Sequence, residues 1–291
     1  MRAEARIVVE ADPARGTRLA VLRGDPPLLL RRTGHPGPDG ELHLHLVGGA
    51  AGPLGGDDLR LDIEVGPGAR LCVRSVAASL ALPGPAGGRS RLAVTARVGS
   101  GGSLRWLPEP LIGAAGCDHV TTSRIELAEG AELRWREELV CGRHAESPGD
   151  VRITTSVRYA GRTLLRSDVA IGPRASGWSG PAVLDGAGAA GTLLLVDPPG
   201  AHTATAHTAT AGAATAGPVS PEAAGVPGVA AAVLPLAGGP AVLISAVGTD
   251  PRAVRRHLDR LSGPTGGPGA SAGRRKPVTN REACRTEPQL A

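Results

Sequence analysis

The sequence is nearly devoid of aromatic residues, since its 291 residues include no Phe, one Tyr and three Trp. Aliphatic side chains must therefore supply nearly all of the buried surface, at about 1.5–3 kcal/mol for each fully enclosed side chain. The shortage also counts against a binder of single-stranded nucleic acid, which interleaves aromatic platforms with basic residues. The net charge of +5 does not alter this conclusion, because Arg alternates with Asp and Glu along the body of the chain. We expect no nucleic-acid partner.

Cysteines are few and widely spaced. Cys72, Cys117, Cys141 and Cys284 form no CxxC pair, which in a chain of this length favours reduced cytosolic thiols over a disulfide framework or a closed thiolate zinc site. Long apolar runs are also missing, because the N-terminus alternates charged and apolar residues and the uncharged stretch 223–248 contains three prolines. These patterns are unlike a signal peptide or a membrane span. We therefore expect a cytoplasmic protein that does not enter a membrane.

Motifs of common catalytic sites are missing as well. The sequence contains no HExxH and no GxxxxGK[ST] pattern, and the glycines of Ser100–Ser103 lie in a turn with no helix behind it. Paired carboxylates occur at Asp57/Asp58 and Glu137/Glu138, but neighbouring residues on a strand point to opposite faces and do not address one substrate together. A β-helical enzyme that uses such pairs is the weakest interpretation, and we expect this chain not to be an enzyme.

One pattern occurs three times in the first half of the chain, at Leu61–Val73, Val94–Trp106 and Ser123–Trp135. Each copy has an alternating run, a glycine turn, and a second run that ends on a large apolar residue. Such a unit cannot bury its apolar face alone, so successive copies must stack. The repeats predict a mainly β, layered body that resembles a β-solenoid.

Stacking makes two predictions about equivalent positions. The turn glycines Gly68, Gly101 and Gly130 should lie on one edge of the body. Trp106 and Trp135, which end the second and third copies, should be at least partly buried.

The remaining sequence suggests a single β domain over about 1–261, with the repeats at about 59–142. Low complexity predicts a loop at about 198–228, and the absence of periodicity predicts a disordered tail at 262–291. One or two short helices should lie near the C-terminus, the main one at Pro251–Leu261 with Asp250 as its cap. Because this segment has apolar residues on more than one side, we expect it to form part of a docking surface.

Candidate metal ligands lie on or beside the repeated strands. Asp62 and Glu64 share one face of a predicted strand, and Glu126 and Glu137 belong to the same acidic group, with His119 as a borderline ligand near the second connection. In one alternative these carboxylates face solvent, as is usual for the polar face of an antiparallel sheet. In the other they line an interior channel for a cation. The sequence leaves both alternatives open.

Two further histidines, His43 and His45, share a face of the predicted strand Glu41–Val47. That spacing can ligate a metal, although a solvated polar face is the more common explanation.

The same repeats carry a family resemblance. The stretch LGGDDLRLDIEVGPGARL at Leu54–Leu71 resembles the GGD…L.L.V.V..GA signature of the urease accessory protein UreD family, also called UreH. Leu104–Ile112 resembles that family's strand before a Leu-Pro-x-Pro turn, and Trp135–Arg143 resembles its W.E….GR block. Where the family has a TTQAATK block after the first repeat, this chain has RSVAASL at Arg74–Leu80.

The resemblance implies a cytosolic maturation factor with a β-rich layered fold. Such a protein bridges apo-urease to UreF and the GTPase UreG, and nickel passes transiently through its body without a tightly bound cofactor. The resemblance makes Asp62, Glu64, Glu126, Glu137 and His119 candidates for a nickel path. The alternative is a β-structured protein-binding module without a metal role.

Overall fold

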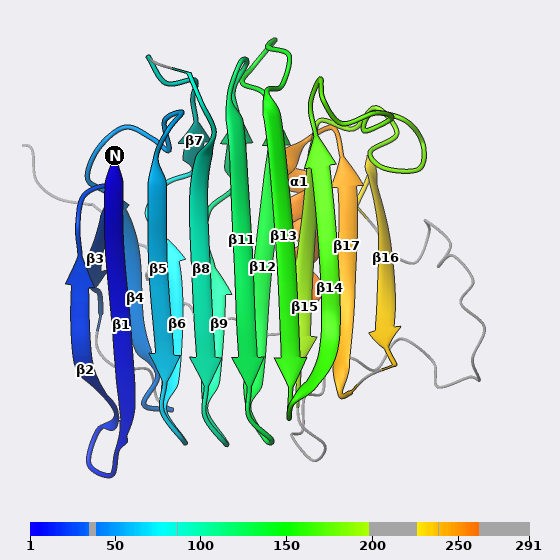
Figure 1. The fold of residues 1–291 in the computed structure, drawn as a ribbon. Coiled ribbons are helices and arrows are strands. Elements are labelled where there is room, and N and C mark those ends of the chain that lie inside the picture. Colours follow the sequence, from blue (N-terminus) through cyan, green and yellow to red (C-terminus); the bar gives the residue numbers. More distant parts are fainter. Residues whose placement is uncertain (35–38, 86, 198–225, 238, 262–291) are drawn as a thin grey trace, which may run out of the picture.

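The computed structural model describes residues 1–34, 39–85, 87–197, 226–237 and 239–261. The repeats form successive coils of a two-layer β-solenoid (Figure 1). The first strand of each coil lies in one sheet, the chain turns at a glycine, and the second strand lies in the other sheet. The mainly β, layered fold predicted from the repeats is therefore confirmed.

The first layer, sheet A, has seven strands. In spatial order they are β14 (Arg162–Ile171), β13 (Asp150–Tyr159), β11 (Asp118–Leu127), β8 (Ser90–Val98), β5 (Asp58–Val65), β1 (Arg2–Asp12) and β2 (Gly16–Gly24). The five central strands are parallel, and β2 and β14 pair antiparallel at the two edges.

The second layer, sheet B, has a parallel centre and antiparallel flanks. Its spatial order is β16 (Val229–Leu236), β17 (Ala241–Gly248), β15 (Ala189–Val196), β12 (Glu132–Cys141), β9 (Ser103–Leu107), β6 (Arg70–Ser75), β4 (Leu42–Gly48) and β3 (Leu28–Arg32). Two short strands, β7 (Ser79–Ala81) and β10 (Leu111–Gly113), pair with each other, and β10 also pairs with β12.

The register of sheet B confirms the alignment of the repeats. Val73, Trp106 and Trp135, which end the three copies, lie opposite one another on β6, β9 and β12. The two indole rings stack with their centroids 5.2 Å apart and their planes 18° apart. Trp106 is 6% exposed and Trp135 is 2% exposed, so both are buried as expected.

The turn glycines also line up at one edge. Gly68, Gly101 and Gly130 have φ values of 68°, 65° and 75°, a left-handed conformation that favours glycine. The backbone N–H of Gly68 donates to the carbonyl of Ser100 in the next coil at 3.0 Å. This contact places neighbouring turns side by side, as stacked repeats require.

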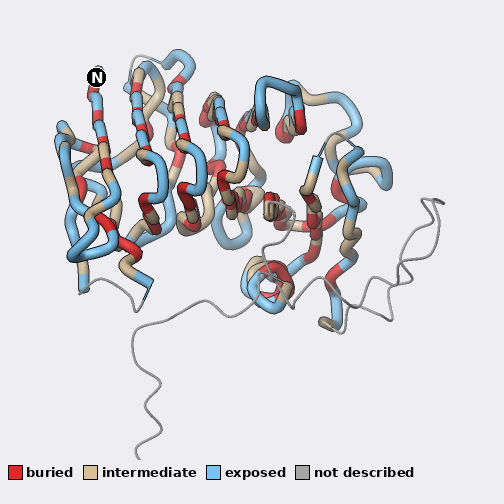
Figure 2. The backbone as a smooth tube through the Cα atoms, turned by 90° about the horizontal axis from the view of Figure 1, so that it is seen from below, coloured by how far each residue is buried: buried red, intermediate tan, exposed pale blue. Residues whose placement is uncertain are grey.

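The core lies between the two sheets. On β5, Leu61, Ile63 and Val65 are buried and alternate with exposed residues, so each strand presents an apolar side to the opposite sheet. Figure 2 views the molecule from below and shows the coils in succession, with the C-terminal helix seen end-on at one face.

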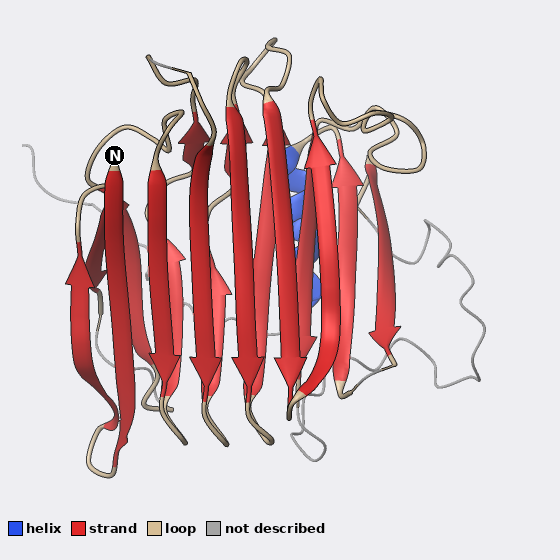
Figure 3. Ribbon diagram, viewed as in Figure 1, coloured by secondary structure: helices blue, strands red, loops and turns tan. Residues whose placement is uncertain are grey.

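The single helix of the described residues, α1 (Pro251–Leu261), matches the predicted segment and lies against sheet B (Figure 3). Its residues Val254 and Leu258 are buried in a cluster with side chains of β15 and β17. A Cβ atom at Gly191 of β15 would lie 2.7 Å from Leu258 Cδ1, so the glycine permits this close approach. The expectation that α1 offers its apolar side to a partner is wrong, because sheet B already covers that side.

Two expectations fall on residues outside the described part of the chain. The predicted loop at 198–228 lies there except for its last three residues, and so does the predicted tail at 262–291. Among the described helices, none is long and apolar enough to cross a membrane.

Candidate functional site

A cavity of about 370 Å³ lies between the two sheets. Its apolar wall includes Leu61 and Val94 of sheet A and Trp106 of sheet B. Its polar wall is formed by side chains from β11 and β12, namely His119, Thr121, Ser123, Arg136, Glu137 and Glu138. A partly open, mostly apolar space with a few convergent polar groups is the usual form of a binding site.

The polar wall on sheet A forms because the inward-facing residues of β11 change from polar to apolar along the strand. His119, Thr121 and Ser123 occupy alternate positions in phase with Ile125 and Leu127, which belong to the main core. Because side chains alternate along a strand, all five face the opposite sheet. One end of β11 therefore packs in the apolar core, and the other end places polar groups against the cavity.

Glu137 of β12 is the acidic group of the interior. Its Oε1 accepts hydrogen bonds from Trp135 Nε1 at 3.0 Å and from Ser123 Oγ at 3.1 Å. Thr155 Oγ1 lies 2.7 Å from Oε2 and 2.8 Å from Oε1. Burial raises the pKa of Glu137, and these hydrogen bonds oppose the rise. The accessible part of the side chain faces the cavity.

His119 is the second titratable group on the wall. It is 1% exposed, and its Nδ1 and Nε2 lie 2.8 Å from Ser90 Oγ and 3.0 Å from Thr121 Oγ1. Burial lowers the pKa of His119 to about 4, against a smaller opposing effect of Asp118. The imidazole is therefore neutral at pH 7, the form in which histidine binds metal ions.

Sheet B is interrupted beside this polar wall. β12 pairs with β9 over Glu132–Trp135 and with β10 over Leu111↔Leu139 to Gly113↔Cys141, so the segment Arg136–Glu138 has no strand partner on that side. The cavity is lined by all three residues of the segment, although neighbouring residues of a strand point to opposite faces. The cavity therefore reaches through the break toward the outer face of sheet B.

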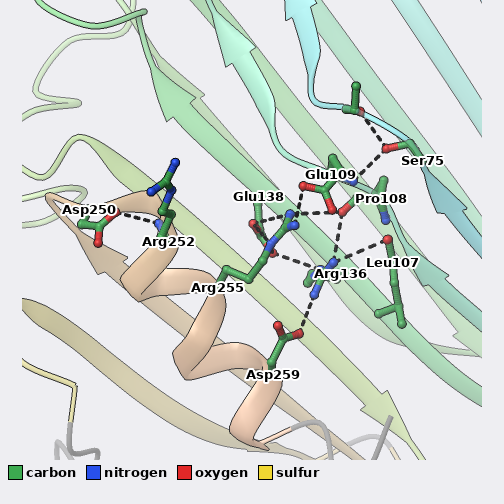
Figure 4. Close-up of polar contacts among 11 residues, drawn as sticks. Ser75, Leu107, Pro108, Glu109, Arg136, Glu138, Asp250, Arg252, Arg255 and Asp259 are labelled. Carbon is green, nitrogen blue, oxygen red and sulfur yellow. Dashed lines mark hydrogen bonds and ion pairs between the residues drawn. The ribbon is translucent and has the colours of Figure 1, made fainter. Parts of the chain in front are cut away.

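Figure 4 shows a network of charged side chains at this break, centred on the buried residues Arg136 and Glu138. Glu138 is bound by Arg136 Nε at 3.0 Å and by Arg255 Nη2 of α1 at 2.9 Å. Arg255 also contacts Glu109 at 2.5 Å, and Arg136 contacts Asp259 of α1 at 2.7 Å. Burial raises the pKa of Glu138, while the two guanidinium groups lower it. The helix is thus fixed to the rim of the cavity by ion pairs.

Two of the five predicted site residues, His119 and Glu137, line the cavity together. Asp62, Glu64 and Glu126 are exposed, and the last two pair with Arg6 and Arg97 at 3.4 Å and 3.8 Å. For these three residues the interior-channel alternative is wrong. The phase of β5 and β11 directs their apolar neighbours inward and leaves the carboxylates on the outer face of sheet A.

Sequence reasoning missed the hydroxyl groups around Glu137. The signal was present, because Ser123 and Thr155 alternate in phase with the apolar positions of β11 and β13. It missed the Glu138–Arg255 pair for a different reason. These residues are 117 positions apart, and no local pattern connects them.

The chain is similar in sequence to known proteins over most of its length. The family model described as UreD urease accessory protein matches residues 1–278. A urease accessory protein UreD from Frankia alni is 43% identical over 91% of this chain and 94% of the relative. The corresponding protein of Streptomyces avermitilis is 43% identical over 89% of this chain and 95% of the relative. Urease accessory protein UreD 3 of Streptomyces griseus is 44% identical over the same shares.

Proposed function

Because this chain belongs to the UreD family of urease accessory proteins, we propose that it serves urease maturation as a scaffold and conduit for nickel. In this proposal Ni²⁺ is the cargo, apo-urease is the recipient, and the chain acts in the cytoplasm without catalysis of its own. UreF-like and UreG-like proteins are its partners. The sequence has no GxxxxGK[ST] motif, so a nucleotide-driven step belongs to a partner.

The observation that carries the proposal is the cavity that joins the interior of the solenoid to the outer face of sheet B. Its polar wall offers the carboxylate of Glu137, the neutral imidazole of His119 and the hydroxyls of Thr121 and Ser123. Imidazole suits Ni²⁺, while carboxylate and hydroxyl oxygens are harder and weaker partners for it. A wall of few and mixed ligands holds Ni²⁺ weakly, which suits a conduit that must release its cargo.

The protonation state of the wall supports the same role. A metal ligand must be deprotonated, and Ni²⁺ binding releases any proton that the ligand carries. Burial raises the pKa of Glu137, whereas its three hydrogen-bond donors favour the carboxylate. The donors therefore limit the rise that burial causes, and a cation that reaches the cavity has this carboxyl group as a ligand.

The test is urease activation at limiting nickel in cells that carry urease, the other accessory genes and a variant of this chain. Glu137→Gln keeps the shape of the side chain and an acceptor for Trp135, but it removes the negative charge. Glu64→Gln makes the same change on the exposed face of sheet A. We expect Glu137→Gln to lower activation severalfold and Glu64→Gln to leave it unchanged.

Assembly must be measured beside activation. Size-exclusion chromatography of the complex with the UreF-like partner should give the same profile for both variants. If Glu137→Gln assembles normally and also supports full activation at limiting nickel, the conduit is refuted. The protein-binding module without a metal role then becomes the better description.

A further inference from the structure

A second cluster of metal-ligand side chains lies on the other face of sheet B, at the junction of β4 and β6. Ligand atoms of Glu41, His43 and Cys72 all lie within 4.8 Å of one another. His43 and Cys72 are direct neighbours across the two parallel strands, and Glu41 lies two residues before His43. Three ligand types thus converge from two adjacent strands and from the residue that precedes β4.

The strand phase separates this cluster from the cavity. Leu42 and Leu44 alternate with His43 along β4, and Leu71 and Val73 flank Cys72 on β6; all four belong to the main core between the sheets. Because side chains alternate along a strand, His43 and Cys72 point away from that core. The cluster is therefore on the outer face of sheet B.

The donor set indicates which ions it can hold. A thiolate, an imidazole and a carboxylate are the protein ligands of Zn²⁺, and sites with three protein ligands keep a fourth position for water or another small ligand. Hard ions such as Mg²⁺ and Ca²⁺ prefer oxygen ligands throughout. We propose that Glu41, His43 and Cys72 bind one borderline divalent transition-metal ion of the Zn²⁺ class.

The surroundings hold the ligands in place. Glu41 Oε2 accepts a hydrogen bond from Arg105 Nη1 at 2.9 Å and lies 3.3 Å from His43 Nε2. Glu41 is 8% exposed and Cys72 is 1% exposed, whereas His43 is half-buried and gives access from outside. Ligands on paired strands of a sheet are more precisely held than ligands on loops.

Arg105 supplies a further observation. Its Nε and Nη2 are buried and have no hydrogen-bond partner among the described residues. A thiolate and a carboxylate neutralise a divalent ion, so the nearby guanidinium groups of Arg105 and Arg74 leave the site with a net positive charge. An anionic fourth ligand such as hydroxide or chloride lowers that positive charge, and the N–H groups at Nε and Nη2 of Arg105 are available to bind it.

The alternation of the sequence predicts that His43 and His45 share one face of a strand, at a spacing that can ligate a metal. In the structure His45 Nδ1 lies 2.6 Å from Thr33 Oγ1, and the groups beside His43 are Glu41 and Cys72. The neighbours of His43 are thus Cys72 across the sheet and Glu41 before it in the chain, and not His45.

The experiment uses the full chain without an affinity tag, with His202→Ala and His207→Ala to remove two imidazoles of the HTATAHTATA segment. Co²⁺ serves as the spectroscopic probe, and Zn²⁺ as the competitor. We expect one equivalent of Co²⁺ to give a thiolate-to-cobalt charge-transfer band that one equivalent of Zn²⁺ abolishes. Excess Mg²⁺ should leave the band unchanged.

Variants assign the ligands. Cys72→Ser should abolish the charge-transfer band, and His43→Gln or Glu41→Gln should weaken Co²⁺ binding by at least ~10-fold, the smallest effect usual even for outer-shell changes. Cys117→Ser, which removes a buried thiol elsewhere in the chain, should keep the band. The near-ultraviolet circular dichroism of the tryptophans verifies that each variant is folded.

Three results would overturn the site: no band in the folded parent, a band that survives Cys72→Ser, or a band that is lost in Cys117→Ser. This inference does not rest on the nickel conduit. Glu137→Gln should leave the cobalt band intact, and loss of the band in Cys72→Ser leaves the cavity unaltered. Failure of one proposal is therefore distinguishable from failure of the other.

Discussion

Glu137 and Glu138 are adjacent on β12 and serve opposite faces of sheet B. Glu137 accepts hydrogen bonds from Ser123 and Thr155 of sheet A, whereas Glu138 binds Arg255 of the outer helix. Both nevertheless line one cavity. This is possible because β12 lacks a strand partner at this level, so the space inside the solenoid continues past the edge of the strand to its other side.

The ion pairs at this opening should stabilise the fold through Glu138, whose side chain is 4% exposed. Arg255→Met removes one of its two guanidinium partners while keeping much of the apolar stem. We expect the free energy of unfolding to fall by about 2 kcal/mol, less than the 3–5 kcal/mol for a fully orphaned buried charge, because Arg136 still contacts Glu138. Urea denaturation measures the change.

The matched control is Arg256→Met on the same helix. Arg256 pairs with Asp250 at 3.6 Å, and both side chains are more than half exposed. Exposed pairs contribute about 0–1 kcal/mol, so this variant should unfold nearly as the parent does. Equal losses in Arg255→Met and Arg256→Met would contradict a structural role for the buried network.

His119 should make stability depend on pH in the acidic range. Its folded-state pKa of about 4 is below the ordinary value of 6.5, so the stability contributed by the neutral imidazole is fully present above pH 6.5. It is lost as the pH falls toward 4, at about 1.4 kcal/mol per pH unit where only the unfolded state takes up the proton. Below pH 4 both states are protonated, and this contribution levels off.

A comparison of the parent with His119→Asn isolates this effect. Glu137 has a raised pKa, so its contribution has the opposite sign and decreases as the pH rises through the folded-state value. The difference in unfolding free energy between the two proteins cancels Glu137 and the other carboxylates. Urea denaturation at intervals from pH 7 to pH 4 should show the parent losing its advantage. A constant difference would contradict a buried neutral His119.

The outer carboxylates of sheet A should be dispensable for nickel transfer. Asp62→Asn combined with Glu64→Gln changes two side chains that face away from the core on β5. We expect full urease activation at limiting nickel, because neither residue lines the cavity. Solubility is the property at risk, since two exposed charges are removed. A severalfold loss of activation with normal assembly would place a nickel route on the outside of the solenoid.

The extent of agreement between sequence and structure follows from the range of the interactions. Local patterns sufficed for Pro251–Leu261, with its cap and its proline, and for the burial of Trp106 and Trp135 at equivalent positions, because a repeat determines which positions are equivalent. They did not show whether the Asp62 side chain lies on the inner or the outer face of sheet A. Either face of an alternating strand can be the buried one until the partner sheet is known. They gave no sign of the break at Arg136–Glu138, which depends on where β9 ends and β10 begins.

Thr155 offers a test of the charge on Glu137 that leaves the carboxylate in place. Its hydroxyl donates to Glu137, and Thr155→Val replaces it with a methyl group of similar size. The lost donor should raise the pKa of Glu137 further, because a hydrogen bond to the charged form favours that form. Since Ni²⁺ competes with the proton for the carboxylate, activation at limiting nickel should fall, and it should fall more at pH 6 than at pH 8.

Thr154→Val makes the same change at the adjacent position, where the side chain points to the other face of β13. It should follow the parent at both pH values. If Thr155→Val loses activation equally at pH 6 and pH 8, the defect is one of packing and not of protonation, and the ionised state of Glu137 has no part in nickel transfer.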